Sequence, residues 1–119
     1  MLKTIPELIA LARENITTLV AKDALEKCNQ CNGILIDVRE PSEFNEKAVP
    51  GAINIPRGVL EMQMVNRYPS AHTDIFIHCA TSGRAILAAE QLQRLGYTNV
   101  NVISCPFDNL YSEYISIHA

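Results

Sequence analysis

The chain has 119 residues, which corresponds to one domain of ordinary size. Hydrophobic residues make up 48% and charged residues 19%, and this balance excludes a disordered protein, which combines low hydrophobicity with high net charge. The net charge of −3 argues against nucleic acids and anionic membrane surfaces as partners, because both bind through clustered positive charge. No apolar run approaches the ~20 residues of a membrane span, and no cleavage site follows an apolar stretch. We therefore expect a cytoplasmic protein with one domain over residues 1–119.

Hydrophobic periodicity and stop signals divide the chain into alternating helices and strands. In chain order, the sequence predicts a helix over 5–14, a strand over 16–17, a helix over 19–28, a strand over 34–38, a helix over 41–44, a strand over 52–55, a helix over 59–68, a strand over 75–78, a helix over 85–95, a strand over 100–103 and a helix over 108–117. The runs 34–38 and 75–78 are largely apolar and rich in branched side chains, which is typical of strands buried on both faces. The alternation predicts an α/β domain with a mostly parallel sheet, whose ligand sites lie beyond the carboxyl ends of the strands.

Polar residues and glycines indicate where some of these helices begin and end. Thr4 and Glu7 have the spacing of a capping box, and Thr18 is the expected N-cap of the second helix. Gly33 is expected to end that helix in a left-handed conformation. The helix over 5–14 is interpreted as an N-terminal extension that either caps the sheet or makes a dimer contact.

Four cysteines stand out in a chain of this size, namely Cys28, Cys31, Cys79 and Cys105. In a reducing cytoplasm, thiols persist because of packing, metal binding or chemistry. Cys28 and Cys31 form a CxxC pair, which alone is a weak metal signal because a structural zinc site takes four ligands. The pair also ends a helix, whereas redox CxxC pairs begin one. We therefore expect no metal site, with Cys28 packed and Cys31 exposed.

The loop that follows the strand at 75–78 carries the strongest chemical signal. It runs from Cys79 through Ala80, Thr81, Ser82 and Gly83 to Arg84. A short loop between a strand and a helix directs backbone N–H groups inward, and the helix N-terminus and Arg84 add positive charge. A thiol in this setting is expected to be held largely as the reactive thiolate. The alternative is that Cys79 is an unreactive core cysteine.

Four segments occur in a specific order and spacing, and they are Leu35 to Glu40, Glu43-Phe44, Pro50 to Pro56, and Cys79 to Arg84. Together they resemble the single-domain rhodanese family, and the similarity extends from about residue 16 to about residue 103. The resemblance implies a five-stranded parallel sheet flanked by helices on both faces. It also implies sulfurtransferase activity, with Cys79 and Arg84 at the two ends of the family's six-residue active-site loop.

The resemblance further implies covalent catalysis without a metal or an organic cofactor. The Cys79 thiolate attacks the outer sulfur of a small anionic donor such as thiosulfate, sulfite leaves, and Cys79 becomes a persulfide. The backbone N–H groups of residues 80–84 are expected to hold the charged terminal sulfur until a thiol or a protein acceptor removes it. A second class of function is a persulfide carrier or protein-binding module with little thiosulfate turnover.

A cysteine-dependent phosphatase is the main alternative enzyme. Such phosphatases carry His-Cys, five residues and then Arg, whereas here four residues separate His78-Cys79 from Arg84. A shorter loop closes around one sulfur atom rather than around a phosphoryl group, so loop length favours sulfur transfer. His78 itself is expected to be a core group with satisfied hydrogen bonds rather than a base.

Two charged residues at the end of the strand over 34–38 are expected to support the site. The resemblance implies that Asp37 and Arg39 lie near its rim, with Arg39 paired to Glu43 in a structural rather than a catalytic role.

Several positions depart from the family pattern, among them Ser82, Ala80, Lys47-Ala48 and the segment that begins at Cys105. Ser82 replaces a usual glycine, so we expect Gly83 to take any positive φ and the Ser82 hydroxyl to be free to contact the bound sulfur. Neutral Ala80 replaces a residue whose positive charge would hold a dianion, so we expect modest affinity for thiosulfate. Cys105 follows the last strand and is a candidate resolving thiol if its Cα lies within ~7 Å of that of Cys79, and is otherwise a thiol without a role.

Overall fold

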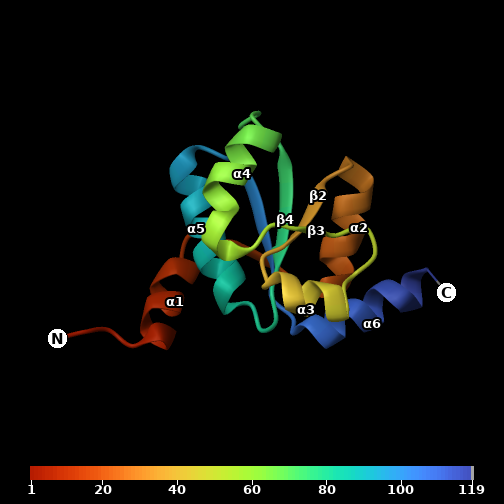
Figure 1. The fold of residues 1–119 in the computed structure, drawn as a ribbon, viewed down its shortest axis with the longest axis horizontal. Coiled ribbons are helices and arrows are strands. Elements are labelled where there is room, and N and C mark those ends of the chain that lie inside the picture. Colours follow the sequence, from red (N-terminus) through yellow and green to blue (C-terminus); the bar gives the residue numbers. More distant parts are fainter. Residues whose placement is uncertain (119) are drawn as a thin grey trace.

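The computed structural model describes residues 1–118 and shows a five-stranded sheet in which all strands run parallel (Figure 1). The strands are β1 (Thr17–Leu19), β2 (Ile34–Asp37), β3 (Ile53–Asn54), β4 (Asp74–His78) and β5 (Asn99–Ile103). Their order across the sheet is β1-β5-β4-β2-β3. The predicted α/β class and parallel sheet are therefore confirmed, and β5 lies beside the strand that leads into Cys79.

Helices cover both faces of the sheet. They are α1 (Ile5–Arg13), α2 (Ala21–Cys31), α3 (Pro41–Glu46), the 3-10 turn η1 (Arg57–Val59), α4 (Leu60–Arg67), α5 (Gly83–Leu95) and α6 (Phe107–Ile117). In Figure 1, α1, α4 and α5 lie on one side of the sheet and α2 and α6 on the other, while α3 lies at the end where the strands finish. Within residues 1–118, no helix is both long enough and apolar enough to cross a bilayer.

The core forms two layers because successive side chains of a strand point to opposite faces. Along β4, Ile75, Ile77 and the following Cys79 pack in the layer beneath α4 and α5. Phe76 packs in the other layer, beneath α2 and α6. Cys79 is thus a buried member of the α5-side layer, at the carboxyl end of a central strand.

The second helix begins and ends at residues other than those expected. β1 continues to Leu19, which pairs with Ile103 of β5, so the N-cap of α2 is Val20 rather than Thr18. Asn32, with a φ of 53°, takes the left-handed position that the sequence assigns to Gly33. Gly33 has a different constraint, because an added Cβ would lie 2.6 Å from the ring of Phe76.

The N-terminal helix α1 packs against α5. The capping interaction at its start is present, since Thr4 Oγ1 accepts a hydrogen bond from the Glu7 N–H at 3.2 Å. Ala12 is buried in the core, and the side chain of Ile9 lies 3.0 Å from where a Cβ atom on Gly83 would stand. The extension therefore contacts the start of α5, next to the cysteine loop.

Candidate active site

The sulfur of Cys79 is held by two backbone N–H groups at the start of α5. Cys79 follows the last residue of β4 and is 1% exposed. Its Sγ accepts hydrogen bonds from the N–H of Ser82 at 3.1 Å and from the N–H of Ala85 at 3.3 Å. The first N–H groups of a helix have no partner within the helix and carry its positive dipole end, so they favour a negatively charged acceptor. The arrangement suits a sulfur that carries negative charge.

Ser82, rather than Gly83, has the positive φ in this loop. Its φ is 89°, and it is the N-cap of α5, whereas Gly83 is the first residue of the helix. The expectation that Gly83 absorbs this conformation is therefore wrong, because helix α5 begins two residues earlier than the predicted helix over 85–95. A serine in this region is strained, and here the strain accompanies an N–H that points at the Cys79 sulfur.

The early helix start also explains why sequence reasoning missed one donor. Ala85 lies outside the residues 80–84 that were expected to supply N–H groups, yet it is the third residue of α5 and donates to the sulfur.

Of the remaining loop residues, Ala80 anchors the loop, since its carbonyl accepts the Phe107 N–H at the start of α6 at 2.9 Å. Thr81 is exposed.

Arg84 forms a two-point ion pair with Glu43 of α3. Its Nη1 donates to Oε1 at 2.8 Å and its Nη2 to Oε2 at 3.1 Å. The Glu43 Oε1 also accepts the Glu40 N–H at 3.0 Å. The hydrogen bond from Arg84, followed by that from Glu40, lowers the pKa of Glu43 to about 2, and the same pairing raises the pKa of Arg84. The cation at the end of the loop is therefore matched by a carboxylate.

Asp37 and Arg39 form a buried pair with each other, so the expected pairing of Arg39 with Glu43 is wrong. The Arg39 Nη2 donates to Asp37 Oδ2 at 2.8 Å, and its Nε and backbone N–H also donate to this carboxylate. Arg39 Nη2 further donates to the Lys47 carbonyl at 2.7 Å, and its guanidinium lies 3.9 Å from the centre of the Phe107 ring. The pair ties the end of β2 to the segment after α3 and to α6.

His78 is fully buried, and neither of its ring nitrogens has a hydrogen-bond partner among residues 1–118. Its Nε2 lies 3.9 Å from Asp37 Oδ2, beyond hydrogen-bond distance. The expectation of a core residue holds, but the expectation of satisfied hydrogen bonds is wrong. Burial lowers the pKa of His78 to about 4, against the opposing effect of Asp37.

The other three cysteines are free thiols outside the loop. Cys105 is half-buried in the α2–α6 layer, and its Sγ accepts the Ala21 N–H at 3.3 Å. Cys28 is packed in the same layer and Cys31 is exposed, as expected. Burial, and then the neighbouring Cys31, raise the pKa of Cys28 to about 11.

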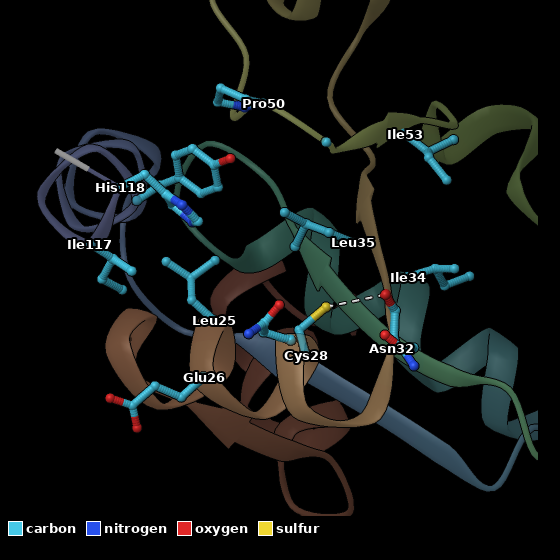
Figure 2. Close-up of a pocket in the computed structure, with 14 residues that line it drawn as sticks. Leu25, Glu26, Cys28, Asn32, Ile34, Leu35, Pro50, Ile53, Ile117 and His118 are labelled. Atoms are coloured by element: carbon cyan, nitrogen blue, oxygen red, sulfur yellow. Dashed lines mark hydrogen bonds between the residues drawn. The ribbon is translucent and has the colours of Figure 1, made fainter.

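A cavity of about 420 Å³ lies on the α2–α6 side of the molecule, between the end of α2, the start of β2 and the end of α6 (Figure 2). Leu25, Leu35 and Ile117 contribute to its lining, and Cys28 beside them donates to the Gly33 carbonyl at 3.3 Å (Figure 2). The lining includes no residue of the loop from 79 to 85. This cavity is therefore separate from the cysteine site.

Comparisons with known proteins find relatives in sequence and similar solved structures. The thiosulfate sulfurtransferase PspE of Escherichia coli is 32% identical over 65 residues, a match that covers 55% of this chain and 62% of PspE. The structure of a thiosulfate sulfurtransferase from Pseudomonas aeruginosa is similar with a TM-score of 0.71 at 26% identity, over 82% of this chain and 19% of that chain. A Rhodopseudomonas palustris protein, described as "Possible Tyrosine Phosphatase", is similar with a TM-score of 0.79 at 26% identity, over 94% of this chain and 92% of that chain.

A family model describes most of the sequence. The model of the rhodanese-like domain matches residues 20–113, a stretch that begins just before α2 and ends within α6. This stretch contains the Cys79 loop, the ion pair of Arg84 with Glu43 and the buried pair of Asp37 and Arg39, and it leaves α1 outside. The chain therefore belongs to the rhodanese-like domain family.

Proposed function

We propose that this protein is a sulfurtransferase that carries the transferred sulfur as a persulfide on Cys79. The observation that supports this most directly is the pair of N–H groups, from Ser82 and Ala85, that point at the Cys79 sulfur. Donors fixed around an atom that gains negative charge stabilise that charge without reorganising. Membership of the rhodanese-like family supports the same assignment.

The proposed reaction has two displacements. In the first, the Cys79 thiolate forms a bond to the outer sulfur of a small anionic donor such as thiosulfate. The S–S bond of the donor breaks, and sulfite leaves with the electron pair. In the second, a thiolate of a small molecule or a protein attacks the terminal sulfur and takes it as a new persulfide, which returns Cys79 to the thiolate. Every electron pair is accounted for by the donor, the acceptor and Cys79, so the proposal includes no metal or organic cofactor.

The test is intact mass spectrometry of the protein after exposure to thiosulfate, combined with the thiosulfate:cyanide turnover assay. We expect a gain of one sulfur atom that is absent in Cys79→Ala and retained in Cys31→Ala, which removes an exposed thiol outside the loop. A Cys79→Ser variant that keeps full turnover would overturn the proposal.

Two other functions are outcomes of the same experiment. Stoichiometric loading of Cys79 with negligible steady-state turnover of thiosulfate would identify a persulfide carrier. Hydrolysis of an aryl phosphate would instead revive the phosphatase suggested by the description of the Rhodopseudomonas palustris protein. The four-residue spacing between Cys79 and Arg84, and the engagement of Arg84 by Glu43, support sulfur transfer over that reaction.

We further propose that the protein acts in a reducing compartment such as the cytoplasm. All four cysteines are free, and Cys31 is exposed to solvent. Such thiols persist where the surroundings are reducing.

A further inference from the structure

The charge of the sulfur donor determines how strongly the site attracts it. Thiosulfate carries two negative charges, so its binding depends on the positive charge that the site presents. Between Cys79 and Ala85, Arg84 is the only ionisable cation in the sequence. The state of Arg84 therefore decides how the loop treats a dianion.

Arg84 is engaged by a carboxylate that is itself held in place. Both terminal nitrogens of its guanidinium bond the two oxygens of Glu43, at 2.8 and 3.1 Å. The backbone N–H of Glu40 donates to the same carboxylate at 3.0 Å, which fixes Glu43 in the first turn of α3. A two-point pair of this kind holds its geometry better than a single-point pair. Glu43 thus cancels most of the positive charge that Arg84 would offer to a ligand at the loop.

Two other arginines near the ends of the central strands are also paired with carboxylates. Arg57, whose N–H donates to the Val38 carbonyl at 3.1 Å, pairs with Glu61 at 2.8 Å. Arg39 is 5% exposed and is neutralised by the buried carboxylate of Asp37. What remains at the Cys79 sulfur is a set of backbone N–H groups, which stabilise one negative charge on sulfur but do not offset a second one.

We propose that Glu43 is a specificity-determining residue, which neutralises Arg84 and so selects sulfane-sulfur donors with a single negative charge over dianionic thiosulfate. The inference rests on the proposed function, and it names the donor class of the same site. The favoured donors include the ionised persulfides of small uncharged thiols. Alkanethiosulfonates belong to the same charge class and supply a stable probe.

The matched probes are thiosulfate and methanethiosulfonate. With methanethiosulfonate, the Cys79 thiolate again takes the outer sulfur, the S–S bond breaks and methanesulfinate leaves with the electron pair. The chemistry at Cys79 is the same for both donors, and the donors differ by one unit of charge. The ratio of their kcat/KM values therefore reports the charge preference of the site.

Glu43→Gln is the central variant, because the amide oxygen still accepts a hydrogen bond from Arg84 while the negative charge is removed. We expect the thiosulfate to methanethiosulfonate ratio of kcat/KM to rise about threefold to tenfold, as an added unit charge near the site predicts. The matched control is Glu46→Gln, which removes the same charge from an exposed residue of the same helix and should leave the ratio unchanged. Glu43→Asp, which keeps the negative charge, should leave the ratio at the value of the unaltered protein.

The outcomes separate this inference from the proposed function. If Glu43→Gln and Glu43→Asp lower turnover of both donors by the same factor, Glu43 only positions the loop and the inference is overturned. An unchanged ratio in Glu43→Gln, or an equal rise in Glu46→Gln, overturns it as well. Absence of sulfur loading on Cys79 of the unaltered protein with either donor overturns the proposed function, and the inference with it. Loading without a shift in the ratio overturns the inference alone.

Discussion

The backbone nitrogen of Ser82 lies 3.1 Å from the sulfur of Cys79, and it reaches this position because Ser82 has a φ of 89°. The interaction uses the backbone of Ser82, so the identity of its side chain is secondary. Glycine adopts a positive φ without steric cost, whereas a β-branched residue meets its strongest resistance there.

Ser82→Gly is therefore expected to preserve the loop and relieve its strain. We expect the free energy of unfolding to rise by about 0.5–1 kcal/mol, because the relief of strain exceeds the entropy that an added glycine costs. Urea denaturation measures this change, and sulfur loading on Cys79 should be retained. Ser82→Val is the opposing variant and should lose both stability and loading. If Ser82→Gly abolished loading, the hydroxyl of Ser82, and not its N–H, would be the group that holds the sulfur.

The pair of Asp37 and Arg39 is expected to contribute strongly to stability, because both side chains are buried. Asp37→Asn leaves the charge of Arg39 without its partner, at a position where the side chain is 6% exposed. Loss of one member of a buried pair costs about 3–5 kcal/mol. Chemical denaturation of Asp37→Asn and of the unaltered protein measures the difference.

The matched control for this prediction is the ion pair of Arg57 and Glu61, whose side chains are 30% and 37% exposed. Glu61→Gln should cost less than about 1 kcal/mol, because solvent screens exposed pairs. Equal losses in the two variants would show that burial does not determine the contribution of the Asp37 pair.

Fold and site differ in how far the sequence could predict them. The runs 34–38 and 75–78 identified β2 and β4 because strands buried on both faces must be apolar, a local property of the sequence. Cys79 was placed at a strand end for the same reason. The start of α5 was misplaced by two residues because Ser82 and Gly83 are poor helix formers, although the structure places Ser82 at the N-cap and Gly83 in the first turn of the helix.

The ion pairs could not be predicted, because they depend on which elements meet in space. From the sequence, both Asp37 and Glu43 are potential carboxylate partners for Arg39 and for Arg84. Glu43 and Arg84 are 41 residues apart in the chain, and spacing rules do not predict pairs at that separation. The choice follows from the position of α3 at the carboxyl end of the sheet, where Glu43 meets the start of α5 (Figure 1). The pairing of Glu43 with Arg84 therefore depends on the tertiary fold and not on local sequence.

His78 is expected to make stability depend on pH. Its pKa is about 4 in the folded protein and about 6.5 when unfolded, so below pH 6.5 the unfolded chain binds a proton that the folded chain does not. The free energy of unfolding should therefore fall as the pH drops from about 6.5 to about 4, by up to about 3 kcal/mol. Denaturation at several pH values between 7 and 5 measures the slope above the range in which Glu43 contributes, because the unfolded chain protonates Glu43 near pH 4.5 while the folded chain holds its pKa at about 2.

His78→Leu, which fills a similar volume without a titrating group, should flatten this dependence on pH. The control is His72→Gln, which alters an exposed histidine and should keep the slope of the unaltered protein. A slope that survives in His78→Leu would assign the pH dependence to other groups.

Cys105 is expected to stabilise α2 rather than to resolve the persulfide. Its sulfur accepts the N–H of Ala21, the first residue of α2, where the N-cap Val20 offers no side-chain acceptor. Cys105→Ala should therefore cost about 1 kcal/mol of unfolding free energy, and Cys105→Ser should cost less because its hydroxyl keeps an acceptor.

The lifetime of the Cys79 persulfide, followed by intact mass spectrometry, should be the same in Cys105→Ser as in the unaltered protein. A resolving role would instead release hydrogen sulfide and form a disulfide between Cys79 and Cys105, and the Cys105→Ser variant would then hold its persulfide several-fold longer. The expected result follows from the packing, because Cys105 packs with the α2–α6 layer and its sulfur accepts the Ala21 N–H, while Cys79 packs with the α5-side layer.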